Sequence, residues 1–238
     1  MSTKGPEMTT ADFAAPAGVN LPALHIQDPG SAITHFIAAI ASIAAAPFLV
    51  ERAIAHGGDF LTVASCIVFA ASLILLYSAS TIYHTVPDGS RIDMTCKKWD
   101  HLSIFILIAG TYTPVCLIGL RADGGVPLLI AVWAVAVLGI AFKLWWVTCP
   151  KWMSSVMYIA MGWLCVFAFP AIIRTFSAGA FGFLLAGGIA YTLGGVLYSC
   201  NLRAWDARHP WFGTHEIFHV FVMLGSLLQF ICIYQFLL

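Results

Sequence analysis

The stretch from Phe60 to His84 reads FLTVASCIVFAASLILLYSASTIYH and contains no lysine, arginine, aspartate or glutamate. A transmembrane helix needs about 20 consecutive apolar residues to cross the hydrocarbon core of a bilayer. This stretch is long enough and apolar enough to do so. We therefore expect it to form one membrane-spanning helix.

Further apolar stretches of similar length follow one another along the chain, separated by short segments with turn-forming Pro, Gly and Asp. In all we expect seven spans, at about Ile33 to Ala55, Phe60 to His84, Leu102 to Leu120, Val126 to Val147, Met153 to Ile173, Phe181 to Cys200 and Ile217 to Leu237. The predicted fold class is an all-α membrane protein, with residues 31–238 forming a seven-transmembrane helix bundle. Residues 1–30, rich in Pro, Thr, Ala and Gly, are expected to form a disordered cytoplasmic tail.

The overall composition agrees with a membrane protein. Hydrophobic residues make up 61% of the chain and charged residues 9%, whereas soluble domains carry about 25% charged residues. The formal net charge is zero, so there is no basic field to attract nucleic acid, and we exclude that class of partner. The seven cysteines occur singly, which predicts neither a disulfide framework nor a thiolate-rich metal site.

Lysine and arginine are distributed unequally between the two ends of the predicted bundle. Eight lie at one end and three at the other: Lys4, Arg91, Lys97, Lys98, Lys143, Lys151, Arg203 and Arg208 against Arg52, Arg121 and Arg174. Positive residues near helix ends are retained in the cytoplasm. We therefore expect a cytoplasmic amino terminus and a carboxyl terminus outside, with Lys143 reaching from its span towards the interface.

Three histidines lie at the ends of spans that this topology brings to the cytoplasmic side. His215 and His219 are one helical turn apart, so their side chains project from the same face of the last span. His84 ends the second span. Histidines are costly inside lipid, and those found there usually face the bundle interior and carry a function. We predict that His84, His215 and His219 bind one zinc ion.

Two further polar residues are expected at the same depth. Asp100 begins the third predicted span, and Ser80 lies one turn before His84. Three histidines with an open fourth position are typical of catalytic zinc, whose bound water has a pKa of about 7. We expect Asp100 to orient that water and accept its proton, and Ser80 to hydrogen-bond a ligand, the water or a substrate carbonyl.

Simpler interpretations of these residues exist. A histidine at the end of a span can be an interfacial anchor, and Asp100 can be a carboxylate favoured by the dipole at a helix amino terminus. The remaining histidines are predicted to be non-ligands, although His101 can support its neighbour Asp100: His25, His35, His56, His101 and His209.

The segment from His215 to His219 also reads as HExxH, the zinc-protease signature in which the glutamate is the general base. An intramembrane zinc protease of this type needs a carboxylate from another helix as its third ligand. Successive residues of a helix are about 100° apart, so Glu216 need not face a metal that His215 binds.

Four segments, STIYH (80–84), WDHLSIF (99–105), AGTYTP (109–114) and HEIFHVFV (215–222), together resemble the bacterial hemolysin III family, whose relatives include the adiponectin and progestin receptors. The resemblance extends from about Ser31 to the carboxyl terminus and implies a multi-pass protein of the bacterial cell membrane with a cytoplasmic amino terminus. It implies the same zinc ligands, Asp100 as partner of the zinc-bound water and Ser80 as the serine before the first ligand. The family belongs to a wider group of membrane hydrolases that includes alkaline ceramidases, which implies a lipid amide as the substrate class.

The leading functional hypothesis is a zinc-dependent hydrolase that acts on an amide bond of a membrane lipid near the cytoplasmic leaflet. The alternative is a sensor of membrane state, or regulator of lipid homeostasis, in which zinc is structural. A cytolysin is less favoured because a water-filled pore needs helices with a continuous polar stripe, and these spans are apolar nearly all round. The sequence predicts neither the substrate itself nor the oligomeric state.

Overall fold

The computed structural model describes residues 26–200, 202–209 and 212–238. Within these residues seven helical segments are long and apolar enough to cross a membrane, which confirms the predicted seven-helix bundle. This part of the chain contains helices and no β-strand. Residues 1–25 of the predicted tail lie outside the described part, and the first helix begins at Pro29.

Four of the spans are single α-helices. Each of the other three combines α-helix with a 3₁₀ or π-helical segment. The single helices are α1 (Pro29–Ala55), α2 (Phe60–Thr85), α4 (Gly125–Trp145) and α7 (Ala178–Cys200). The composite spans are α3 (Asp93–Pro114) with the π-helical turn η2 (Val115–Gly119), α5 (Lys151–Gly162) with the 3₁₀ turn η3 (Trp163–Ala168) and α6 (Phe169–Thr175), and α9 (Thr214–Cys232) with η4 (Ile233–Leu237). A short helix, α8 (Arg203–Asp206), precedes α9.

The third span differs most from its predicted bounds. The prediction began with the apolar run at Leu102, whereas α3 begins at Asp93. Hydropathy marks only the part of a helix that lies in hydrocarbon, and polar residues such as lysine continue a helix readily. Asp100 therefore lies about two turns inside α3, by the 3.6-residue repeat of a helix. The prediction that Asp100 begins this helix, and its interpretation as a terminal carboxylate, are wrong.

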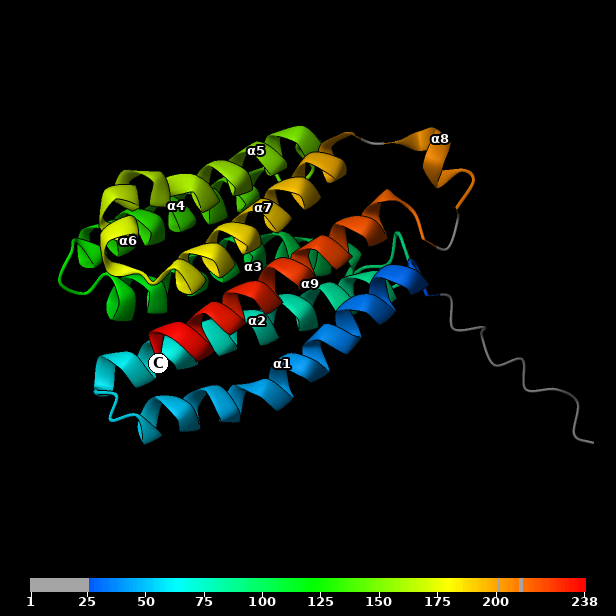
Figure 1. Ribbon diagram of the computed structural model, residues 1–238. Helices are drawn as coiled ribbons and strands as arrows, with labels where there is room; N and C mark the ends of the chain where they lie inside the picture. Colours follow the sequence, from blue (N-terminus) through cyan, green and yellow to red (C-terminus); the bar gives the residue numbers. More distant parts are fainter. Residues whose placement is uncertain (1–25, 201, 210–211) are drawn as a thin grey trace, which may run out of the picture.

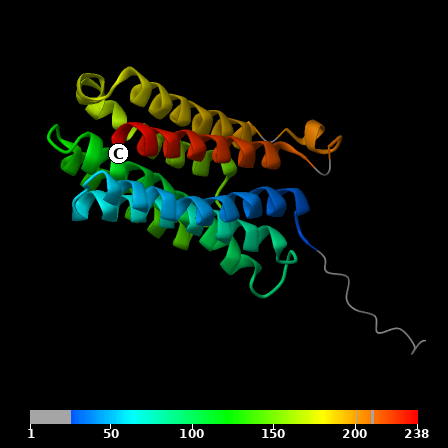
Figure 2. The same ribbon diagram turned by 60° about the horizontal axis from the view of Figure 1, so that its bottom comes forward.

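Helix α1 packs against both α2 and α9, and α7 packs along α9 (Figures 1 and 2). Helix α3 packs against α2 and α4, and more of it is buried than of any other span in the described residues. The start of α1, the end of α2 and the start of α9 meet at one end of the bundle (Figure 1). The carboxyl terminus lies at the opposite end.

The start of α9 is held by hydrogen bonds to two carboxylates, Asp206 before Gly213 and Glu216 after it. Asp206 accepts hydrogen bonds from the backbone N–H of Thr214 (2.7 Å) and from its hydroxyl (2.6 Å). These bonds lower the pKa of Asp206 from its ordinary value. The backbone N–H of Gly213 donates to Glu216 Oε2 (2.8 Å). Because free N–H groups at a helix start are satisfied in this way, the first turn of α9 has a defined position.

Lys143 is buried rather than extended to the interface. It is 0% exposed, and its ammonium group donates to Ser154 Oγ (2.6 Å) and Cys149 Sγ (3.1 Å). The prediction that it reaches the interface is wrong, because Cys149 in the turn after α4 and Ser154 in the first turn of α5 supply acceptors inside the protein. All seven cysteines lie within the described residues, and each is a free thiol.

Candidate metal centre

Three imidazole rings meet where the end of α2 lies beside the start of α9. One nitrogen each from His84, His215 and His219 lies within 4.8 Å of the other two. His84 Nε2 and His215 Nε2 lie 3.2 Å apart. His84 and His219 are each 2% exposed. The structure thus brings together the three histidines that the sequence predicted as ligands.

The outer nitrogens of two of these rings have hydrogen-bond partners from the start of α1. His84 Nδ1 lies 3.1 Å from Asp28 Oδ2, and His219 Nδ1 lies 3.3 Å from Thr34 Oγ1. A carboxylate only accepts, and the Thr34 hydroxyl already donates its hydrogen to the carbonyl of Ser31 (2.9 Å). In a neutral imidazole, each ring then donates from Nδ1 and keeps the lone pair of Nε2 free.

A metal-bound imidazole needs one nitrogen without a hydrogen to bind the ion, and it usually donates the hydrogen of its other nitrogen to a nearby acceptor. His84 and His219 are both arranged in this way. Lone pairs that face one another across a few ångströms repel unless a proton or a cation lies between them. Three imidazole donors favour zinc or another borderline divalent ion rather than calcium or magnesium, which prefer oxygen ligands. The residues present therefore fit a zinc ion.

Asp100 and Ser80 lie beside the histidines without belonging to the group of ligand atoms. Asp100 is 8% exposed, and its Oδ2 lies 3.4 Å from Nδ1 of His101. Ser80 is 1% exposed, and its hydroxyl has no hydrogen-bond partner in the described residues. The partnership of His101 with Asp100 agrees with the sequence prediction.

Glu216 lines the same cavity but does not belong to the group of candidate ligand atoms. Its Oε1 accepts from the hydroxyl of Ser31 (2.6 Å), and its Oε2 accepts from the backbone N–H of Gly213 (2.8 Å). Both carboxylate oxygens are thus used to join α9 to α1 and to cap α9. This geometry does not favour the protease interpretation of HExxH, in which Glu216 would be the general base.

Sequence reasoning missed the contribution of the start of α1. Besides Asp28, Ser31 and Thr34, it contains His35, whose ring stacks on that of His219 with centroids 3.5 Å apart. His35 is 3% exposed, and neither ring nitrogen has a partner in the described residues. A signal was present, since these polar residues recur at a three- to four-residue spacing in an apolar helix.

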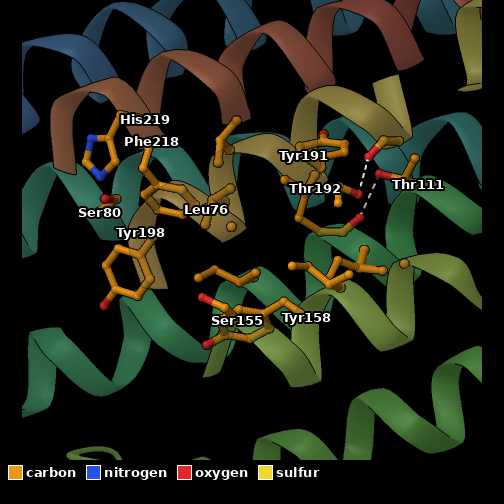
Figure 3. Close-up of a pocket in the computed structure, with 18 of the residues that line it drawn as sticks. Leu76, Ser80, Thr111, Ser155, Tyr158, Tyr191, Thr192, Tyr198, Phe218 and His219 are labelled. Carbon is orange, nitrogen blue, oxygen red and sulfur yellow. Dashed lines mark hydrogen bonds between the residues drawn. The ribbon is translucent and has the colours of Figure 1, made fainter. Parts of the chain in front are cut away.

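A cavity of about 520 Å³ extends from the histidines into the bundle. The three histidines, Ser80 and Asp100 all line it. Figure 3 shows His219, Ser80 and Tyr198 at one end of the view and Tyr191, Thr111 and Thr192 at the other. Most of the remaining lining is aliphatic or aromatic and includes Leu76, Leu107, Ile108, Leu128, Ile172 and Phe181. Such a cavity suits an elongated apolar ligand whose polar end lies at the histidines.

The fold and the site together define a class: a multi-pass membrane protein with seven spans and a cluster of three histidines, two of them buried, that lines a cavity in the bundle. Residues 25–230 match the protein family described as haemolysin-III related. The chain is 37% identical over 212 residues to Hemolysin-3 of Bacillus cereus, covering 89% of this chain and 92% of that protein. It is 36% identical over 207 residues to the Hemolysin-3 homolog of Bacillus subtilis (strain 168), covering 87% and 92% respectively. The chain belongs to the hemolysin III family, which confirms the resemblance seen in its motifs.

Proposed function

We propose that this protein is a zinc-dependent hydrolase that cleaves an amide bond of a membrane lipid. One observation carries the proposal: three convergent imidazoles lie at one end of a largely apolar cavity that Asp100 and Ser80 also line. Histidines alone suit a structural metal, and an apolar cavity alone suits a lipid-binding protein. A metal centre that opens into a lipid-sized cavity supports chemistry on the lipid.

His84, His215 and His219 would hold the ion. Zinc in such a centre supplies a Lewis acid that polarises a carbonyl oxygen and makes water nucleophilic near neutral pH. Only three protein side chains would hold the ion, so a water molecule or the substrate could bind it as well. The burial of His84 and His219 keeps bulk water away, which strengthens electrostatic interactions within the site.

Asp100 is proposed to move the proton. Its buried carboxylate, supported by His101, takes a proton from the attacking water and returns it to the leaving nitrogen as the amide C–N bond breaks. The products are a fatty acid and an amine. The Ser80 hydroxyl, which has no partner among the described residues, donates to the carbonyl oxygen of the substrate.

The proposed substrate class rests on the cavity and on the relationship to membrane hydrolases that the resemblance to the hemolysin III family implies. The volume of about 520 Å³ falls within the range of roughly 300–1,000 Å³ that is usual for ligand sites. The aliphatic lining accommodates an acyl chain, and the amide lies at the histidines. We therefore infer an N-acyl lipid.

Replacing Asp100 by Asn tests the proposal. We expect hydrolysis of fluorescent N-acyl lipids in mixed micelles to fall by about 10²–10⁴-fold, the usual contribution of a general acid–base group. Zinc content, measured by elemental analysis of the detergent-purified protein, stays at the wild-type level because all three ligands remain. Asp88→Asn is the matched control, since Asp88 is an exposed carboxylate just beyond α2. Unchanged turnover by Asp100→Asn removes Asp100 from the mechanism.

A sensor with structural zinc is the second candidate. It is favoured by one observation, that the cluster joins α2 to α9 across 131 positions of sequence between His84 and His215. In this case the purified protein binds zinc but cleaves no lipid amide in a broad panel. The His84→Ala variant then unfolds at a lower temperature, and Asp100→Asn behaves as wild type.

We further propose that the histidine end of the bundle is cytoplasmic. The unequal numbers of lysine and arginine support this orientation. The three arginines of the other end also have partners within the protein: Arg121 pairs with Asp59 (2.6 Å), Arg174 pairs with Asp123, and Arg52 lies over the ring of Tyr234. The metal centre would then face the cytoplasmic leaflet.

A further inference from the structure

We infer that the start of α1 positions the histidine rings of the metal centre from outside, although α1 supplies none of the three ligands. Asp28 and Thr34 are the positioning residues, and Ser31 fixes the helix that carries them. The inference rests on the metal-binding part of the proposed function and does not depend on hydrolysis. It assigns a role to a helix whose residues drew no functional prediction from the sequence.

Asp28 holds His84 at two points. Its backbone N–H donates to the His84 carbonyl (3.0 Å), and its carboxylate accepts from His84 Nδ1 (3.1 Å). The first contact fixes the last turn of α2, and the second fixes the rotation of the ring about its own side-chain bonds. Together they direct Nε2 of His84 towards His215, which lies 3.2 Å away.

Thr34 holds His219 in an equivalent way from the next turn of α1. Its hydroxyl hydrogen is donated to the Ser31 carbonyl, so the oxygen can only accept from His219 Nδ1 (3.3 Å). Thr34 therefore selects the tautomer in which Nε2 of His219 is a free donor to a metal. A threonine with a free hydroxyl hydrogen could not make this selection, because it could equally donate to the ring.

Ser31 ties α1 to α9. Its hydroxyl donates to Glu216 Oε1 (2.6 Å), and Glu216 adjoins the ligand His215. Ser31 itself is 0% exposed. The contacts of α1 thus reach both ligand-bearing helices, and a displacement of α1 would move the partners of His84 and His219 together.

A positioning role differs from ordinary helix packing in its consequences. The Asp28 side chain is 48% exposed, so its loss removes a partner of His84 without opening a cavity in the core. Outer hydrogen-bond partners of metal-bound histidines raise ligand basicity and fix ring orientation, and their loss typically lowers metal affinity by about 10–100-fold. Packing alone would change thermal stability and leave metal affinity unchanged.

The experiment compares the full-length wild type with Asp28→Ala, Asp28→Asn and Thr34→Val after chelator treatment and removal of the chelator. Each purified protein is titrated with zinc against a competing chromophoric chelator, and with cobalt to record the visible absorption of the tetrahedral ion. We expect zinc affinity to fall by about 10–100-fold in Asp28→Ala, less in Asp28→Asn, and the cobalt bands to shift or broaden. Thr34→Ser, which retains the hydroxyl, restores the affinity lost in Thr34→Val. Asp88→Asn, the exposed carboxylate used as control above, keeps wild-type affinity.

The outcomes separate this inference from the proposed function. If Asp28→Ala binds zinc with wild-type affinity and gives the wild-type cobalt spectrum, the positioning role is wrong while the metal centre stands. If the wild type binds no zinc, both the proposed function and this inference are wrong. Should Asp28→Ala fail to fold, Asp28→Asn carries the comparison, because it preserves the size of the side chain.

Discussion

His84 is the candidate ligand at which the start of α1, the end of α2 and the start of α9 meet. It is the single member of the cluster that comes from α2, its Nδ1 contacts Asp28 before α1, and its Nε2 faces His215 of α9. Its ring is buried, so bulk water has little access to it. His84 therefore links α2 to both α1 and α9 at the candidate metal centre.

Replacing His84 by Ala is expected to abolish stoichiometric zinc binding. Two imidazoles from one helix remain, and the affinity should fall by more than the roughly 100-fold that marks the loss of an outer partner. Elemental analysis and chelator competition measure this. His56→Ala is the control, because His56 follows α1 at the other end of the bundle and is exposed. Full zinc occupancy in His84→Ala would contradict the three-histidine centre.

At the scale of elements, the contact between α2 and α3 sets the position of Asp100 relative to Ser80 and His84. The two helices approach closely at Gly110, where an added Cβ atom would lie 2.6 Å from Ser72 Cβ and also clash with the Ser72 hydroxyl. The Ser72 hydroxyl donates to the carbonyl of Phe69 within α2 (2.7 Å), so it is not free to turn away without losing that bond. A larger residue at Gly110 must therefore separate the helices.

Gly110→Ala is expected to reduce hydrolysis while zinc remains bound. The added methyl group displaces α3, which carries Asp100, but all three candidate ligands lie on α2 and α9. Overpacking of this kind typically lowers the free energy of unfolding by about 1–3 kcal/mol. Lipid turnover, zinc content and the melting temperature in detergent test this. The control is Gly182→Ala in α7, where no atom lies within 4 Å of the added Cβ. Loss of zinc together with activity would show that α3 supports the ligands as well.

At the scale of the whole molecule, the described chain begins at the histidine end and finishes at the opposite end, as seven spans require (Figure 1). The histidine end gathers Arg91, Lys97, Lys98, Lys143 and Lys151, whereas the other end has Arg52, Arg121 and Arg174. If the histidine end, which has more lysine and arginine, is cytoplasmic, the candidate metal centre lies near the cytoplasmic leaflet.

Reporter fusions test the proposed orientation. Alkaline phosphatase folds only outside the cytoplasm, so its fusion to Leu238 should be active in bacteria, and a green fluorescent protein fusion at the same residue should be dark. A second pair of fusions in the loop between α2 and α3, after Asp88, should give the reverse pattern. A fluorescent fusion at Leu238 would place the metal centre on the outer side and contradict the proposal.

Much of the fold could be predicted from the sequence because it follows from local composition. A segment in hydrocarbon must satisfy its backbone hydrogen bonds internally, so each apolar run of sufficient length forms a helix on its own. The three histidines were predictable for a related reason: the alternation of spans brings the end of α2 and the start of α9 to the same end of any seven-helix bundle. Neither result requires knowledge of which helices are neighbours.

The tertiary structure decided which helices pack together and which faces they share. Nearly every face of these helices is apolar, so periodicity does not identify the side that faces a neighbour. The partnerships of Asp28 with His84, Thr34 with His219, and Lys143 with Ser154 arise from this lateral packing. The sequence by itself therefore determined the seven spans and the candidate ligands. Only the tertiary structure brought α1 against the histidines, because contacts between distant segments depend on side-chain packing and not on local hydropathy.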